Sequence, residues 1–600
     1  ATREAWTPLP NENPFVSFLR HSPQHYGLVQ GTVALAFADH LFETVPPAMI
    51  GAGVDVIARG NASMIARLGF RTIASRIGFL GAASTALWLL DACVGYFHST
   101  TSERLALAVE NDLRNEAYRH LERLDAAVIE SRPVSDWIVL IDDDIARIGR
   151  FIGVDIDPII TIAANSLIVL TTFLSFSPVL ALAHLALAPF LFFLSRAILS
   201  RLVERYKTMR EYETRLTRVL HGNVAGITTI ASYTQQEYEA NRVAQAAEEW
   251  GEAMTRFNNL SAFYGPAIRV TGGIGFLSTL LWGSVLAARG DVSTGAYSQM
   301  SSASLRLLNA LGRLGGAIEH YERANVSMAR VVRMLERRPE VTGGAGFLSD
   351  TAARGDIVFE AVRFGYNSEN PVLRDVDIRF PGGKISALVG STGAGKTTVL
   401  KLLLRFYESQ SGSIRIGGAN IRDVELNSLR GQMALVPQNT FLFGGTIREN
   451  IAYSRRNASD AEVREAARIA GANAFISELP DGYETIITEG GFQLSGGQQQ
   501  RIAIARAVLS KRSVLLFDEA TSAIDFETEA AIQHSLREAA GDQTIVLIAH
   551  RLSTVRNADI IYVIDDGRVV EEGRHHDLIR ANGLYASLWR IQTGETASRS

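Results

Sequence analysis

Long apolar stretches dominate the first half of the chain, and they limit what this part can fold into. The clearest are residues 77–98, 158–177 and 178–199, and weaker candidates are residues 26–57, 263–288 and 294–318. A helix needs roughly 20 mostly apolar residues to cross ~30 Å of hydrocarbon. Buried core helices of a large soluble domain are the alternative, but such cores rarely need apolar runs of this length. The sequence therefore predicts an all-α membrane domain of six spans within residues 1–335.

Two long charged stretches separate the predicted spans. Ser99–Asp157 and Ser200–Ala262 carry Glu, Asp and Arg at helical spacings, with few Pro or Gly residues. Loops of this length are seldom coil, so we expect helices that project into solvent. The even number of spans places both ends of the domain on one side. If the ends are cytoplasmic, the Arg-rich loop Ala58–Arg76 is external, against the usual excess of positive charge on the cytoplasmic side.

The second half of the chain differs from the first in composition and in hydrophobic pattern. Residues 336–356 are rich in Gly, Thr and Ser and predict a linker. Residues 357–594 alternate short β-branched strands with helical segments, which indicates an α/β domain, and residues 595–600 form a tail. The mean hydropathy of +0.09 fits this combination of a membrane part and a soluble part.

Charge and cysteine content exclude several classes of protein. The net charge of −4 offers no basic field for nucleic acid, so we expect no nucleic-acid partner. The single cysteine, Cys93, excludes a fold built on disulfides. No cleavable apolar segment with basic flanks is evident, so we expect no signal peptide. Only 5 of the 59 basic residues are lysine, which is typical of a GC-rich, bacterial genome.

A glycine-rich loop carries the strongest chemical pattern. Gly390–Thr398 reads GSTGAGKTT, follows the strand-like KISALV and precedes the helical VLKLLLRFY. It matches G-x-x-x-x-G-K-[ST] in the strand–loop–helix context that the pattern requires, which disfavours a chance match or a purely structural turn. The glycines let backbone N–H groups close around phosphate oxygens, and the helix N-terminus adds its dipole. Lys396 would reach the β- and γ-phosphates, and Thr397 would bind Mg²⁺.

A second pattern supplies carboxylates. Ser513–Glu519 (SVLLFDE) reads as a buried strand that ends in two acids. Behind a phosphate loop, such an end offers one carboxylate for Mg²⁺ and a neighbour that polarises water. We assign the first role to Asp518 and the second to Glu519. A strand end that merely faces solvent is the alternative.

Leu494–Arg501 (LSGGQQQR) resembles the signature motif of ATP-binding-cassette (ABC) ATPases, and the family's other motifs appear in order. Tyr366 matches the aromatic residue that stacks on adenine, and Gln438 matches the glutamine beside the metal. His550 matches the switch histidine at the γ-phosphate. Ser522–Asp525 (SAID) matches the loop that crosses the dimer interface, with Ile where Leu is more common.

The resemblance covers Asp356–Gln592, and with six preceding spans the chain looks like a half-sized exporter of the multidrug/lipid-A flippase type. It implies ATP and Mg²⁺ as cofactors. In this family the phosphate loop of one cassette and the signature of another enclose each nucleotide, so two chains are needed. We expect a homodimer, because closed twofold assemblies are the commonest, and a heterodimer with another half-transporter is the alternative.

The residues expected to act on the nucleotide come from these motifs. The binding set is Tyr366, Gly390, Ser391, Gly393, Ala394, Gly395, Lys396, Thr397, Thr398, Gln438, Asp518 and His550, with Glu519, Gln438 and His550 as the catalytic set and Thr397, Gln438 and Asp518 around Mg²⁺. Leu494, Ser495, Gly496, Gly497 and Gln498 would act on the partner's ATP.

The resemblance implies export by alternating access. ATP would close the cassettes, and coupling segments near Leu113–Arg119 and Glu211–His221 would transmit the closure to the spans. The cargo would be an amphipathic or anionic small molecule, lipid or peptide, moved across a bacterial inner membrane with the ATPase domain in the cytoplasm. A nucleotide-gated channel or regulator is an alternative that intact Glu519 and His550 disfavour, and a soluble ABC ATPase is disfavoured by the apolar spans.

Polar residues within the spans suggest a transport pathway. Asp39 and Glu43 lie four apart on the first span, and Asp91 lies on the second. Charges inside spans are costly and usually functional, with internal ion pairs as the structural alternative and a misplaced span boundary as a third. One face of the last span carries residues spaced three and four apart, namely Gln299, Ser302, Arg306, Asn309 and Arg313.

Overall fold

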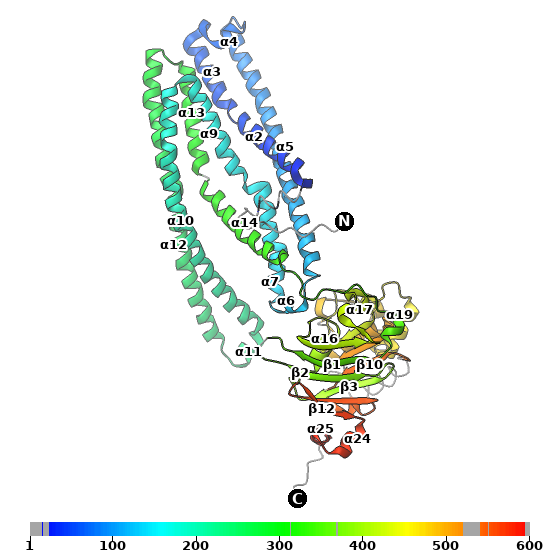
Figure 1. Ribbon diagram of the computed structural model, residues 1–600. Helices are drawn as coiled ribbons and strands as arrows, with labels where there is room; N and C mark the ends of the chain where they lie inside the picture. Colours follow the sequence, from blue (N-terminus) through cyan, green and yellow to red (C-terminus); the bar gives the residue numbers. More distant parts are fainter. Residues whose placement is uncertain are drawn as a thin grey trace. The chain divides into compact units, whose positions relative to one another are not determined.

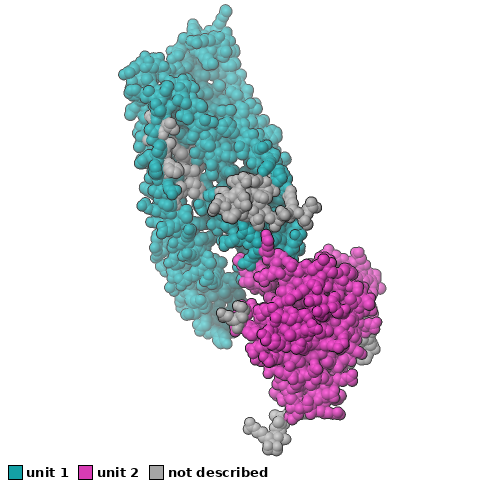
Figure 2. Space-filling view, viewed as in Figure 1, with its two compact units in different colours: residues 1–123, 133–337 teal, residues 124–132, 338–600 magenta. Residues whose placement is uncertain are grey.

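The protein divides into two compact units (Figure 2). A computed structural model describes residues 15, 18, 23–312, 314–367, 370–491, 493–519, 541–549 and 551–593. The membrane unit comprises residues 1–123 and 133–337, and the cassette unit comprises residues 124–132 and 338–600. The cassette unit is therefore discontinuous in the sequence.

The regular elements of the membrane unit, in its described part, are all helical (Figure 1). They are α2 (Tyr26–Phe42), α3 (Val45–Arg59), α4 (Met64–Arg67), α5 (Ile73–Leu121), α7 (Val134–Val139), α8 (Ile145–Arg150), α9 (Asp157–Phe176), α10 (Pro178–Ala225), α11 (Ile227–Ser232), α12 (Gln236–Arg289), α13 (Thr294–Gly312) and α14 (Leu314–Leu335). Two π-helical turns, Leu140–Asp144 and Phe151–Asp155, flank α8.

Three of these helices are far longer than a bilayer is thick. α5, α10 and α12 contain 49, 48 and 54 residues, which corresponds to about 70–80 Å at 1.5 Å per residue. Much of the two charged stretches therefore continues the spanning helices. Within the described chain, four helical segments are long and apolar enough to cross a membrane: Pro23–Ala62, Ile73–Leu121, Val134–Phe176 and Gln236–Arg289. The six-span count stays a prediction.

Local sequence explains where the helices break. α3 carries Pro46 and Pro47 in its first turn, where a proline removes no intrahelical hydrogen bond. The predicted first span, residues 26–57, is therefore two consecutive helices. Between α9 and α10, Ser177 is extended with a φ of −156°, and this residue separates the predicted third and fourth spans.

Arg76 explains part of the positive charge in the loop between α3 and α5. Its side chain is buried, and its guanidinium donates to the backbone oxygens of Phe70 (2.8 Å) and Arg71 (3.0 Å) and to the side-chain oxygen of Asn61 (2.6 Å). The guanidinium has five N–H donors and can tie several backbone turns together. Arg76 therefore closes the loop, and its charge says little about which side of the membrane the loop occupies.

Helices α3 and α13 approach each other through glycines. A Cβ atom on Gly51 would lie 2.6 Å from the backbone oxygen of Gly295, and one on Gly295 would lie 2.1 Å from that of Gly51. One turn further along α3, the Asp55 carboxylate accepts hydrogen bonds from the Gly295 N–H (2.8 Å) and the Ser293 hydroxyl (2.9 Å). Small residues allow this close approach, and the carboxylate suits the N-terminus of α13.

Sheets form the framework of the cassette unit (Figure 1). Its described strands are β1 (Ile357–Phe364), β2 (Leu373–Phe380), β3 (Ile385–Gly390), β4 (Ser411–Ile416), β5 (Ala419–Asn420), β6 (Met433–Val436), β7 (Gly445–Thr446), β8 (Ile486–Ile487), β9 (Val514–Asp518), β10 (Thr544–Ile548), β11 (Ile560–Asp565) and β12 (Arg568–Gly573). The largest sheet has the order β12-β11-β3-β10-β9-β6 and is parallel apart from β12. An antiparallel sheet has the order β2-β1-β4-β5, and β7 pairs with β8.

Most described helices of the cassette unit pack into two hydrophobic cores, and a third core around Val563 and Tyr585 holds the last ones. One core joins the two larger sheets around Phe359, Phe380 and Leu400. The second joins α18 to α21 around Ile451, Ile476 and Ile502. The described helices are α6 (Ala126–Glu130), α15 (Asp350–Ala353), α16 (Lys396–Leu403), α17 (Leu426–Gly431), α18 (Ile447–Ala452), α19 (Asp460–Ile469), α20 (Asn473–Glu478), α21 (Gly496–Leu509), α23 (Leu552–Val555), α24 (His575–Ala581) and α25 (Leu584–Thr593).

The predicted linker, residues 336–356, is mostly part of the cassette unit. The Gly346 N–H donates to the backbone oxygen of Asp423 (2.8 Å), and the Gly346 oxygen accepts from the Glu425 N–H (2.8 Å). Leu348 is buried in the core between the sheets. Composition predicted a linker, and these backbone contacts hold the segment on the cassette.

Residues 124–132 also belong to the cassette unit, although they follow α5 in the sequence. The predicted coupling segment Leu113–Arg119 lies earlier, within α5, where Leu113 is fully buried in the membrane unit. The coupling role of that segment stays a prediction.

Candidate functional site

The carboxyl ends of neighbouring parallel strands gather the predicted nucleotide residues at one edge of the main sheet. β3 ends at Gly390, β9 ends at Asp518, and β6 ends two residues before Gln438. The register aligns these ends, because Ile548 of β10 pairs with both Leu388 of β3 and Asp518. Open α/β sheets bind their ligands at this edge.

The phosphate loop requires glycine at its two ends. Gly390 has a φ of 147°, and a Cβ atom there would lie 2.0 Å from the backbone oxygen of Ile564. Gly395 has a φ of 101°, and a Cβ atom there would lie 2.6 Å from the Leu373 side chain. Both conformations suit glycine and disfavour any side chain. The helix α16 begins at the next residue, so its unpaired N–H groups and dipole meet the loop.

Lys396 is buried and closes the loop. Its ammonium donates to the backbone oxygens of Gly390 (2.9 Å) and Ser391 (2.8 Å). Burial lowers the pKa of Lys396, and the nearby carboxylates of Glu519 and Asp518 oppose that shift. The side chain is thus placed beside the loop that would hold the β- and γ-phosphates.

Oxygen donors suited to Mg²⁺ meet beside this lysine. The Thr397 hydroxyl donates to the Asp518 carboxylate (3.0 Å), and burial raises the pKa of Asp518 while the hydrogen bond from Thr397 lowers it. Hydroxyl, carboxylate and amide oxygens are ligands that Mg²⁺ accepts, usually together with substrate phosphates and water. Among the described residues, no group of three His, Cys, Asp or Glu side chains is placed to hold a metal. In a nucleotide complex, phosphate oxygens would complete the coordination.

Gln438 and Glu519 meet at the same edge. The Gln438 amide N–H donates to the Glu519 carboxylate, and the backbone N–H of Glu519 donates to the oxygen of Ile548 (3.1 Å). The φ of Glu519 is 52°, in the left-handed region. The structure therefore brings the predicted catalytic carboxylate and the predicted glutamine into contact.

Tyr366 presents an exposed aromatic face. Its side chain is 47% exposed, and its hydroxyl is 3.1 Å from the Thr398 hydroxyl on α16. The rings of Phe364 and Tyr407 approach its edge or face with centroids at 5.1 Å. A supported and partly exposed aromatic ring can stack on a nucleotide base.

The signature segment begins the helix α21. The Ser495 hydroxyl accepts from the Gln498 N–H (3.3 Å), and the Gln498 amide oxygen accepts from the Ser495 N–H (2.9 Å), which completes a capping box. α21 packs in the core with α18 to α20, whereas α16 packs in the core between the sheets. The signature and the phosphate loop thus belong to different cores of one cassette. His550, Arg313 and Ser522–Asp525 lie outside the described residues.

In the membrane unit, the predicted pathway residues join a larger polar cluster. Arg306 donates to the carboxylate of Glu43 (2.8 Å) and to the side-chain oxygen of Asn165 (3.4 Å). Asp39 lies 3.4 Å from His98. Asn309 is exposed. The acids of the first span therefore contact Arg306 and His98.

Sequence reasoning missed the centre of this cluster. His40 is buried, and its Nε2 atom lies 3.4 Å from the Asp157 carboxylate and 2.8 Å from the Thr161 hydroxyl. Asp157 also lies 3.5 Å from the ring of His98. A histidine inside an apolar span was the available signal, but its partner Asp157 stood at the end of a stretch interpreted as helices that project into solvent.

Family models match both halves of the chain. The model described as the ABC transporter transmembrane region matches residues 32–311, and the ABC transporter model matches residues 373–522. The predicted fusion of an all-α membrane domain to an α/β P-loop ATPase domain is confirmed.

Relatives and a solved structure agree with these matches. The uncharacterized ABC transporter ATP-binding protein YknV of Bacillus subtilis is 34% identical over 84% of this chain and 84% of its own length. The ATP-dependent lipid A-core flippase of Vibrio parahaemolyticus is 37% identical over 69% of this chain and 72% of its own length. A solved structure of a bacterial Atm1-family ABC exporter with ATP bound has a TM-score of 0.83 at 28% identity, over 97% of this chain and 99% of that one. The chain belongs to the ABC transporter family, as a half-transporter of the exporter type whose ATPase drives transport across a membrane.

Proposed function

We propose that the nucleotide chemistry is carried by the side chains at the carboxyl edge of the main sheet. Lys396 binds the β- and γ-phosphates, Thr397 and Asp518 bind Mg²⁺, and Glu519 polarises the attacking water. Two hydrogen bonds beside the buried lysine carry this proposal. One joins Thr397 to Asp518, and the other joins Gln438 to Glu519. His550 is proposed as the γ-phosphate contact from its motif alone.

We propose further that two copies of this chain form the working transporter in a bacterial inner membrane. Each cassette has one phosphate loop and one signature segment, in different hydrophobic cores. A twofold dimer would bring the signature of each chain to the nucleotide of the other, and would give two equivalent sites.

The proposed cargo is an amphiphile, recognised without a requirement for negative charge. The cation that could attract an anionic group, Arg306, is engaged by Glu43 at 2.8 Å, so the described part of this face is balanced rather than cationic. Relatives named as lipid A-core flippases support an amphipathic, lipid-like cargo.

The test is ATPase stimulation in lipid nanodiscs with a panel of amphiphiles that share one chain and differ in head group. Neutral, zwitterionic and anionic members should all stimulate hydrolysis, and a soluble anionic peptide should not. Lys396→Ala is the matched inactive protein, because it removes the charge that meets the phosphates and should weaken nucleotide binding itself. Stimulation confined to anionic compounds would contradict the proposed cargo class, and full ATPase activity in Lys396→Ala would contradict the proposed site.

A further inference from the structure

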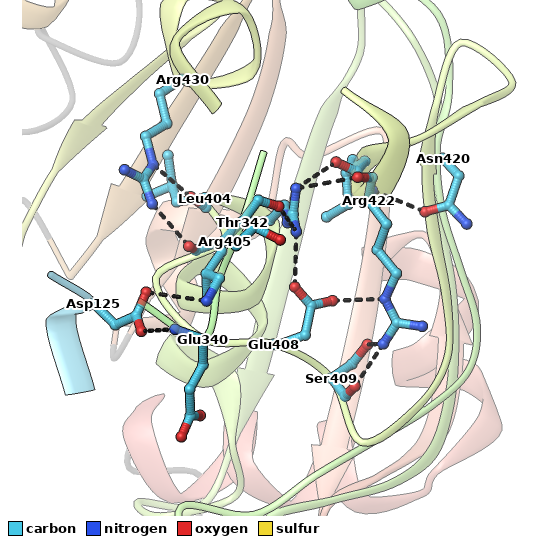
Figure 3. A network of polar contacts seen from close by, with 12 residues as sticks. Asp125, Glu340, Thr342, Leu404, Arg405, Glu408, Ser409, Asn420, Arg422 and Arg430 are labelled. Atoms are coloured by element: carbon cyan, nitrogen blue, oxygen red, sulfur yellow. Dashed lines mark hydrogen bonds and ion pairs between the residues drawn. The ribbon is translucent and has the colours of Figure 1, made fainter. Parts of the chain in front are cut away.

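The short helix α6 is held on the cassette unit at both of its ends. Before its first residue, the Asp125 carboxylate accepts hydrogen bonds from the backbone N–H groups of Glu340 (2.6 Å) and Val341 (3.2 Å), as Figure 3 shows for Asp125 and Glu340. Nearby, Arg405 donates to the Thr342 oxygen (3.0 Å) and to the Glu408 carboxylate (2.9 Å), which fixes the backbone that Asp125 contacts (Figure 3).

The last residue of α6, Glu130, contacts α16 and the turn that follows it. Its carboxylate accepts from the Lys401 ammonium (3.0 and 3.1 Å) and from the Tyr407 hydroxyl (2.6 Å). Burial opposes ionisation of Glu130, but the hydrogen bonds from Tyr407 and Lys401 outweigh it and hold the pKa of Glu130 below its ordinary value. Burial and the facing carboxylate raise the pKa of Tyr407. The contact is therefore an ionised carboxylate bound by a cation and a hydroxyl.

The same two partners support the aromatic ring of Tyr366. The Lys401 ammonium lies 5.8 Å from the centre of the Tyr366 ring and 5.5 Å from that of Tyr407. The two tyrosine rings are perpendicular, with an interplanar angle of 89° and centroids 5.1 Å apart. Such edge-to-face pairs and cation–π contacts each favour one ring orientation.

We propose that Glu130, Lys401 and Tyr407 are positioning residues for the purine base, because they fix the ring of Tyr366 and thereby link base binding to the docking of α6. This inference rests on the proposed base-stacking role of Tyr366. Glu130 touches no nucleotide in this scheme and acts through Lys401 and Tyr407. Thermodynamic coupling is reciprocal. If docked α6 strengthens binding of the base by fixing the Tyr366 ring, then binding of the base must also stabilise the docked position of α6.

The base dependence separates this proposal from a purely structural contact. If Glu130 only anchors α6, its loss changes the docking of α6 and leaves nucleotide affinity unchanged. If it acts through α16 on the phosphate loop, its loss weakens the binding of ATP and of a base-free triphosphate equally. If it acts through Tyr366, only the ligand that carries a base is weakened.

The experiment compares ATP with inorganic tripolyphosphate as ligands of the full chain in nanodiscs. Calorimetric titrations in EDTA avoid hydrolysis. We expect Glu130→Gln and Tyr407→Phe each to weaken ATP about 3- to 10-fold, the range for loss of one aromatic contact, and to leave tripolyphosphate affinity unchanged. Lys401→Met should behave like Glu130→Gln. Lys401→Arg, which keeps the positive charge, should bind ATP as tightly as the parent protein. Glu465→Gln, which breaks the exposed pair with Arg468 on α19, is the matched control and should change the affinity for neither ligand.

A double variant and a reciprocal measurement complete the test. Tyr366→Ala should weaken the binding of ATP and not that of tripolyphosphate. The double variant Tyr366→Ala with Glu130→Gln should bind ATP no more weakly than Tyr366→Ala alone. Hydrogen exchange of residues 124–132 should slow with ATP and not with tripolyphosphate. Additive losses, or equal losses for both ligands, would overturn the proposal. Unchanged ATP affinity in Tyr366→Ala would instead overturn the base-stacking role on which it rests.

Discussion

A single backbone angle places the group proposed to activate water. Glu519 follows β9 directly, has a φ of 52° and is held by the oxygen of Ile548 on the adjacent strand. Non-glycine residues avoid this left-handed region, and those found there are held by their surroundings, often at functional sites. The turn lets Asp518 and Glu519 meet different partners, Thr397 for the first and Gln438 for the second.

Glu519→Gln should therefore separate binding from hydrolysis. The amide retains the size of the side chain but cannot accept a proton, while Thr397 and Asp518 remain for Mg²⁺. We expect hydrolysis to slow at least ~100-fold with nucleotide affinity retained. Steady-state ATPase assays and ATP titrations measure the two effects, and a near wild-type rate would show that Glu519 is not the general base.

Arg306→Gln should affect stability more than cargo selection. Its removal takes away the guanidinium that lies 2.8 Å from the Glu43 carboxylate and leaves that carboxylate with the His40 ring at 3.6 Å. Loss of one member of a partly buried ion pair destabilises more than removal of both. The single variant should lower the melting temperature in detergent, and Arg306→Gln with Glu43→Gln should recover part of the loss. A single variant of normal stability that loses only stimulation by anionic amphiphiles would assign Arg306 to the cargo.

Contiguous residues were predictable from the sequence, and contacts between distant residues were not. Lys396, Thr397 and the Asp518–Glu519 pair could be assigned because their motifs are short and their strand–loop–helix context is local. The Tyr407 hydroxyl meets Glu130 across 277 positions, and Thr161 meets His40 across 121. No spacing rule connects such residues, because the folding of intervening helices brings them together.

Helix contacts in the membrane unit depend on a few small residues. Gly51 and Gly53 both lie on α3, but only a Cβ atom on Gly51 would collide with α13, whereas one on Gly53 would meet nothing within 4 Å. Replacing each glycine by alanine therefore separates the effect of helix packing from the effect of helix propensity.

Gly51→Ala should destabilise the membrane unit by about 1–3 kcal/mol, the usual cost of overpacking. Gly53→Ala should be neutral or should stabilise it by up to ~1 kcal/mol, because alanine favours the helix. Thermal unfolding in one detergent measures both. Equal melting temperatures for the two variants would mean that α3 and α13 do not rely on this close approach.

Element type was predictable where the apolar or alternating pattern was long, and boundaries were not. The break between α2 and α3 was hidden inside one apolar run, although Pro46 and Pro47 mark it. The charged stretch Ser99–Asp157 was predicted as helix, and it also contains the two π-helical turns and the separate helix α6, which charge spacing does not reveal.

At the scale of the whole transporter, Ser495 tests the shared nucleotide site. Its hydroxyl caps α21 through a capping box with Gln498, and Ser459 caps α19 through an equivalent box with Glu462. Removing either cap should cost about 1 kcal/mol locally. Only Ser495→Ala should also impair the ATP-driven closure of two cassettes.

Closure can be followed by the distance between spin labels at Glu484 of two chains, with Cys93 replaced by serine. ATP should shorten this distance in the parent protein and in Ser459→Ala. In Ser495→Ala the shortening should be reduced while ATP still occupies the phosphate loop. Undiminished closure in Ser495→Ala would count against a site completed by a second chain.

Because the cassette unit recruits residues 124–132 from the middle of the preceding helices, it is not a portable module. A graft that exchanged only residues 357–594 between two relatives would leave Lys401 and Tyr407 facing a foreign α6 without a matched carboxylate, and would cut away the buried Leu348. Recombination at the apparent domain boundary should therefore yield weakly active hybrids. Exchanges that carry residues 124–132 and 338–356 along with the cassette should succeed more often, so the two stretches are expected to change together as such chains diverge.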